Sequence, residues 1–105
     1  MNFTKTFHWE EEREHRENFI RENIGFGQVL AEFIVDKGHK NGLEIHKVTS
    51  TAIIMIFNLR TGKWITSLIA RPNQIRRLYE AEHKEAPKGL YEIALHHFEK
   101  GWHEI

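Results

Sequence analysis

The chain has 105 residues, with 15 basic and 15 acidic side chains, and 40% of its residues are hydrophobic. That length and composition predict one soluble domain over residues 1–105 and exclude a low-complexity chain. The sequence has no cysteine, which excludes disulfides, thiolate nucleophiles and cysteine-bound zinc. Its first residues contain no apolar signal region, and its longest apolar run spans 52–57. We therefore expect a cytoplasmic protein with no membrane partner.

Two helices are predicted in the N-terminal third. Residues 8–23 are polar and helix-favouring, and acidic residues crowd the first turn, where the helix dipole stabilises them. Gly25 and Gly27 then interrupt the pattern. Over 28–37 the apolar residues recur at i, i+1, i+4 and i+5, which predicts a packed helix that ends at Gly38.

An antiparallel meander of three strands is predicted next, and a fourth strand is left open. Residues 43–49 form the first strand, in which Glu44 and His46 share one face because side chains alternate along a strand. Residues 52–57 are apolar on both faces, which predicts a central strand covered on both sides. A glycine-containing turn then leads into the partner strand over 64–70.

Two further helices are predicted after the sheet. Pro72 suits a first helical turn, and Ile75, Leu78 and Tyr79 form the inward stripe of this helix. In the last helix, over 90–102, apolar residues recur every four positions. The predicted fold class is therefore α+β, with two N-terminal helices, an antiparallel meander and two C-terminal helices.

Charge is sorted along the chain by segment. Residues 1–36 hold four basic and eight acidic residues, residues 37–79 hold eight and one, and residues 80–105 hold three and six. A basic block between acidic segments predicts a face that attracts RNA or another polyanion. The alternative is that glutamate-rich helices merely flank a lysine-decorated sheet. The cations assigned to the basic face are Lys40, Lys47, Arg60, Lys63, Arg76 and Arg77.

Two aromatic residues lie among these cations in the sequence. Trp64 and Tyr79 are interleaved with arginines, a pattern that suits single-stranded nucleic acid through phosphate contact and base stacking. The same two residues fit equally well as parts of the core.

A candidate acid–base site surrounds the lone acid of the basic block. RNA cleavage by attack of the 2′-hydroxyl needs a base, an acid for the leaving 5′ oxygen and a cation for the phosphate. We assign Glu44 or His39 as the base, His46 as the acid and Arg71 as the phosphate clamp. The alternative is a Glu–His pair on an exposed strand with no catalytic part. The spacing of these histidines matches no zinc signature, and no nucleotide-binding loop is present, so we expect no metal and no cofactor.

A set of residues in the middle of the chain carries a family resemblance. They are Gly38-His39, Asn41-Gly42, Glu44, His46, Thr61-Gly62-Lys63, Leu68-Ile69-Ala70-Arg71-Pro72, Gln74-Ile75 and Tyr79. This set resembles small phage-associated proteins of Gram-positive bacteria. More distantly, the layout of helices followed by a meander is similar to the barnase/RelE-like ribonucleases, a fold shared by many toxins. That similarity implies a histidine or glutamate base, an arginine and often a threonine or tyrosine. The positions that could match here are His39, Glu44, His46, Arg71 and Thr66.

Three functional hypotheses follow. The first is a small RNA-binding protein that is also a candidate metal-independent endoribonuclease. The second is a non-enzymatic phage or host accessory protein that binds a protein or nucleic acid through its basic face. The third is a homo-oligomeric structural domain in which Trp9, Trp64 and Trp102 anchor an interface.

Overall fold

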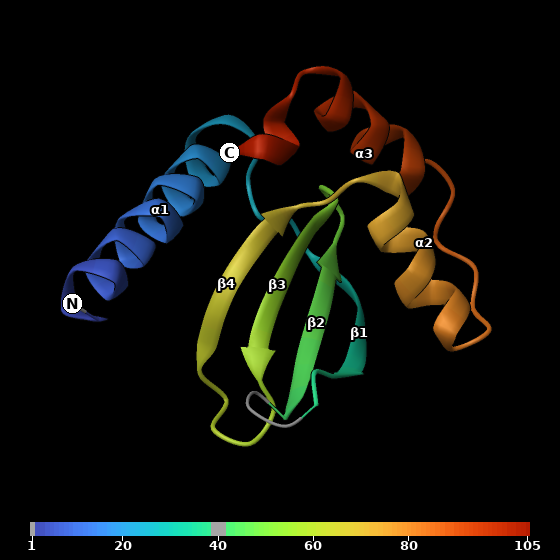
Figure 1. Cartoon of the computed structure of the whole chain (residues 1–105). Helices are drawn as coiled ribbons and strands as arrows, with labels where there is room; N and C mark the ends of the chain where they lie inside the picture. The colour runs from blue at the N-terminus through green and yellow to red at the C-terminus, as the bar shows by residue number, and fades with distance from the viewer. Residues whose placement is uncertain (1, 39–41) are drawn as a thin grey trace.

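The computed structural model describes residues 2–38 and 42–105, with side chains from residue 11 onward. Figure 1 shows a four-stranded antiparallel sheet with a long helix beside one edge, one shorter helix across one end and another shorter helix on the side of the opposite edge. None of the described helices is long and apolar enough to cross a membrane. In chain order the elements are α1 (Asn2–Asn23), β1 (Val29–Asp36), β2 (Leu43–Thr49), β3 (Ile53–Asn58), β4 (Trp64–Ile69), α2 (Pro72–Ala81), α3 (Leu90–Glu99) and the 3-10 helix η1 (Trp102–Glu104).

The predicted α+β class is confirmed, but the prediction of a second N-terminal helix over 28–37 is wrong. Residues 28–37 contain strand β1, which pairs with β2 from Val29 to Asp36 and makes the sheet four-stranded. The i, i+4 spacing of apolar residues there also fits alternation, since Ala31, Phe33 and Val35 fall on one face. β-Branched residues favour the extended form, and pairing with β2 decides between the two.

The chain therefore has one N-terminal helix, and α1 begins at Asn2 rather than at residue 8. The predicted strands over 43–49, 52–57 and 64–70 correspond to β2, β3 and β4. The last predicted helix ends earlier than expected, because α3 stops at Glu99 and the chain re-forms a short 3-10 turn after Gly101. Gly101 has a φ of 75°, a left-handed conformation that favours glycine.

One face of the sheet is covered by α2 and α3, and we call it the helix-covered face. Phe33, Val48 and Ile54 on this face are almost completely buried. From the helices, Tyr79 packs edge-on against Phe33, with 4.8 Å between the ring centroids, and Ala94 is fully buried in the same cluster. This is the larger of the two clusters of buried residues.

The opposite face, which we call the second face, is covered over β3 and β4. Ile53 and Ile69 there form a smaller core with Ile20 of α1, which is fully buried. Over β1 and β2 the same face is more open, since Ile34 is 62% exposed. On the second face, β1 and β2 are therefore partly exposed to solvent.

Candidate functional site

The predicted acid–base pair is formed as a hydrogen-bonded contact on β2. His46 Nε2 lies 3.0 Å from Glu44 Oε1, and the two residues are 8% and 5% exposed. They point to the helix-covered face, as the alternation along the strand predicts. A carboxylate oxygen accepts hydrogen bonds, so a ring that carries a proton on Nε2 donates to Oε1 in this contact. The pair has the hydrogen-bonding pattern of an acid–base couple, and it is largely closed to solvent.

Arg71 does not join this pair. Glu44 is opposite Asn58 at one end of the sheet, whereas Ile69 is opposite Ile53 at the other end. At about 3.3 Å per residue, that register separates Glu44 from Arg71 by roughly 20 Å along the strands, which is beyond the reach of an arginine side chain. Arg71 is instead the N-cap residue of α2, and its backbone N–H donates to Gln74 Oε1 over 2.9 Å.

Thr66, the further residue implied by the ribonuclease similarity, has a structural partner. It lies opposite Ile56, two strands away from His46. Its Oγ1 accepts a hydrogen bond from Arg16 Nη1 of α1 over 3.1 Å. His39 and Lys40, the other residues assigned to the site or to the basic face, lie outside the described residues. Among residues 2–38 and 42–105, no group of three or more histidines and acids is placed to hold a metal ion.

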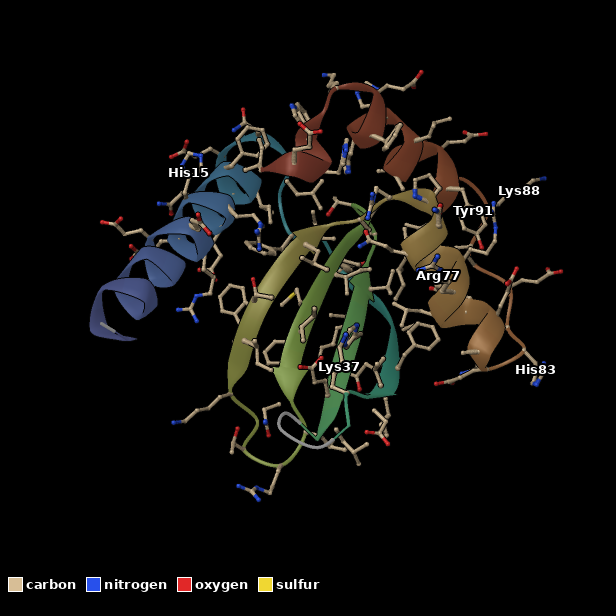
Figure 2. All side chains as sticks on the ribbon, in the orientation of Figure 1. His15, Lys37, Arg77, His83, Lys88 and Tyr91 are labelled. Atoms are coloured by element: carbon tan, nitrogen blue, oxygen red, sulfur yellow. The ribbon has the colours of Figure 1, made fainter. Side chains whose placement is uncertain are left out.

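The predicted basic face is divided between two separate surfaces. Arg76 and Arg77 are exposed on α2, where the Arg76 guanidinium lies 5.3 Å from the centre of the Tyr91 ring. Figure 2 shows Arg77 on this helix. Lys47 belongs to the second face, and Arg60 and Lys63 belong to the β3–β4 hairpin. The cations therefore form two groups rather than one face.

The second group surrounds a pair of aromatic rings. The Lys47 ammonium lies 4.8 Å from the centre of the Phe57 ring, which is also stacked with Trp64 at 6.3 Å and an interplanar angle of 24°. Both rings are half-buried. Arg60 and Lys63 follow in the adjoining turn, and both are exposed. We call this set of Lys47, Phe57, Arg60, Lys63 and Trp64 the aromatic–basic surface.

The local structure explains how these side chains meet. β2 and β3 pair so that Ile45 is opposite Phe57, which places Lys47 two residues along the same face. A register shift at Phe57 brings Trp64 of β4 opposite that ring. Trp64 is held by its indole N–H, which donates to Thr66 O over 3.0 Å and to Ser67 Oγ over 3.1 Å. Two rings and three cations on one surface can stack bases and contact phosphates.

Phe57 and Lys37 are two residues that the sequence reasoning did not assign to a site. Phe57 lies inside the apolar run over 52–57, which predicts a core position, and its neighbours Lys47 and Trp64 come from other strands. Lys37 is exposed at the end of β1, and its backbone N–H donates to Gly42 O over 2.9 Å. The Leu59 N–H donates to Leu43 O over 3.0 Å, so the two hairpins lie side by side and Lys37 shares one end of the sheet with Arg60.

His97 is a buried ionisable group at the opposite end of the sheet from the acid–base pair. It is 4% exposed on α3 and lines a hollow of about 350 Å³ together with Thr51 and Trp102. Its ring lies 5.6 Å from that of Trp102. Burial lowers the pKa of His97, and the nearby His96 and Lys100 lower this pKa further because they disfavour a second positive charge.

This lowered pKa predicts a loss of stability on acidification. The unfolded His97 takes up a proton near pH 6.5, whereas the folded ring does so at a lower pH, so the unfolded state binds more protons between the two values. We expect the free energy of unfolding to fall as the pH drops below about 6.5, and the loss to level off below the folded pKa. Urea unfolding at several pH values measures this slope. In His97→Gln it should be shallower, whereas His15→Gln, at an exposed position on α1 (Figure 2), should keep the parent slope.

Comparisons of the chain with protein-family models, with curated proteins and with solved structures found no match.

Proposed function

We propose that this protein binds single-stranded RNA through the aromatic–basic surface. The observation that carries the proposal is the Lys47 ammonium over the Phe57 ring, which is itself stacked on Trp64. Every base has a π-face, so half-buried rings next to cations favour single strands without requiring a particular sequence. Arg60 and Lys63 add two exposed charges in the adjoining turn, where a phosphate backbone would pass.

The charges of the aromatic–basic surface also favour the binding of a polyanion. The Lys47 ammonium is 3.4 Å from Glu32 Oε1, so its charge is partly balanced. For Arg60 and Lys63, by contrast, no ion pair is formed with any residue of the described chain. Their charges are therefore the ones that phosphates would neutralise, with release of counterions.

The proposal predicts a salt-dependent affinity that depends on Arg60 and Lys63. Lys63→Ala and Arg60→Ala should each weaken RNA binding roughly fivefold at 0.1 M salt and reduce the salt slope by about 0.7, since each loses one phosphate contact on a single strand. Fluorescence anisotropy with a labelled mixed-sequence RNA, over a series of salt concentrations, measures both quantities.

Arg77→Ala is the matched control for this experiment. It removes the same charge from an exposed position on α2, outside the aromatic–basic surface, and should bind RNA like the parent. Equal losses in all three variants would mean that only net charge matters, and this outcome contradicts the proposed surface. A parent protein that does not bind RNA at low salt would also overturn the proposal.

Cleavage of RNA is the second candidate function, at a site on the opposite face of the sheet from the aromatic–basic surface. The observation in its favour is the 3.0 Å hydrogen bond between Glu44 and His46. Because Arg71 is remote from the pair, the transition-state charge would need another cation, and Lys37 and Arg60 are on the same end of the sheet. Incubation with mixed-sequence RNA in EDTA tests this function. Cleavage by the parent and not by His46→Ala would establish this function. If the RNA stays intact, cleavage is excluded and RNA binding is the one function that remains proposed.

A further inference from the structure

The two edge strands of the sheet, β4 and β1, differ in how far other parts of the chain cover their outward backbone groups. On β4, Thr66 and Leu68 are opposite Ile56 and Ile54, and backbone groups alternate in direction along a strand. The carbonyls of Ile65 and Ser67 therefore point outward, away from β3. They accept hydrogen bonds from α1, Ile65 O from Arg13 over 3.3 Å and Ser67 O from Arg16 over 3.2 Å. The β4 edge is thus covered by a helix, and two of its outward carbonyls accept hydrogen bonds from that helix.

The β1 edge has no such cover. The Lys37 N–H donates to Gly42 O across to β2, so by alternation the backbone groups of Val35 and Phe33 also face β2. Those of Glu32, Ile34 and Asp36 then point outward. Within the described part of the chain, no hydrogen bond reaches these three outward N–H and C=O groups. α2 meets β1 on the helix-covered face, where Tyr79 contacts Phe33.

This open edge is also apolar. Val29, Leu30 and Ile34 are 48%, 43% and 62% exposed, and all three belong to β1. A long apolar edge strand with unpaired backbone groups is a template for pairing with another strand. Leu43, next to Asp36 in the sheet, is 45% exposed and extends the apolar strip across β2.

We propose that β1 pairs with β1 of a second copy of this chain, antiparallel and about a two-fold axis, so that the two sheets become one. An antiparallel edge is self-complementary under such an axis, because each outward N–H can meet an outward C=O of the partner. The acidic charge along this edge is partly neutralised within each copy, because the Lys47 ammonium lies 3.4 Å from Glu32 Oε1.

The backbone pattern allows a direct test. We expect the full chain to approach twice the mass of one chain at high micromolar concentration in analytical ultracentrifugation. Under the same conditions, amide hydrogen exchange should slow at Glu32, Ile34 and Asp36 as concentration rises, whereas Phe33 and Val35, already bonded to β2, should be protected at every concentration. A chain that stays monomeric, or a dimer whose three outward amides exchange as fast as in the monomer, overturns the proposal.

A pair of charge-introducing variants adds a second test. Ile34→Lys places a charge in the strip at a position that is already 62% exposed, so it should leave folding intact and abolish the dimer. The matched control is Leu95→Lys at a 47% exposed position on α3, which should dimerise like the parent. If Ile34→Lys still dimerises, or if both variants lose the dimer equally, association does not use the β1 edge.

Discussion

Phe33→Ala should reduce the free energy of unfolding by about 3–5 kcal/mol, the usual cost of removing a buried phenylalanine ring. Phe33 is 2% exposed and lies between the sheet and α2, in edge contact with Tyr79. The loss combines the transfer free energy of the ring with the cavity that the helix cannot fill. Domains of this size are stable by only about 5–15 kcal/mol, so the variant should unfold at a much lower urea concentration.

The neighbouring residue provides the control for that experiment. Ile34→Ala changes the same strand but removes a side chain that is 62% exposed, so it should cost well under 1 kcal/mol. Urea unfolding followed by circular dichroism compares the two variants, at a protein concentration low enough to keep the chains apart. Equal effects at positions 33 and 34 would contradict the register that buries Phe33 and exposes Ile34.

Local patterns in the sequence predicted the elements whose signals are unambiguous. The alternation of 43–49 places Glu44 and His46 on one face, and the structure shows them hydrogen-bonded there. Pro72 was predicted at the start of a helix, and α2 begins at that residue. These features depend on the local backbone geometry of a few consecutive residues, and the residue types in such a short segment are enough to predict that geometry.

The errors concern interactions between distant segments. The apolar spacing over 28–37 fits both a helix and a strand, and only pairing with β2 selects the strand. The site prediction placed Arg71 with Glu44 because both lie in the basic block, but the sheet register puts them at opposite ends. In the same way, the register and not the sequence brings Lys47 to Phe57.

The second large effect is expected at the buried acid–base pair. Glu44→Leu should cost about 3 kcal/mol, because it removes the carboxylate that accepts from His46 and leaves that imidazole N–H buried without a partner. The cost does not arise from lost packing, since leucine fills a similar volume. Glu44→Gln retains an acceptor for the same N–H and should cost distinctly less.

A double variant tests whether the hydrogen bond between Glu44 and His46 stabilises the fold and whether the pair takes part in RNA binding. If the hydrogen bond serves only the fold, Glu44→Leu combined with His46→Leu should be more stable than Glu44→Leu alone, because both polar groups are then replaced by apolar ones. Urea unfolding of the parent, the two single variants and the double variant gives the coupling free energy between the residues. RNA binding by the double variant should match that of the parent, because the pair lies on the helix-covered face and the aromatic–basic surface on the second face. A double variant that folds but does not bind RNA would contradict that assignment and place the pair within the RNA site.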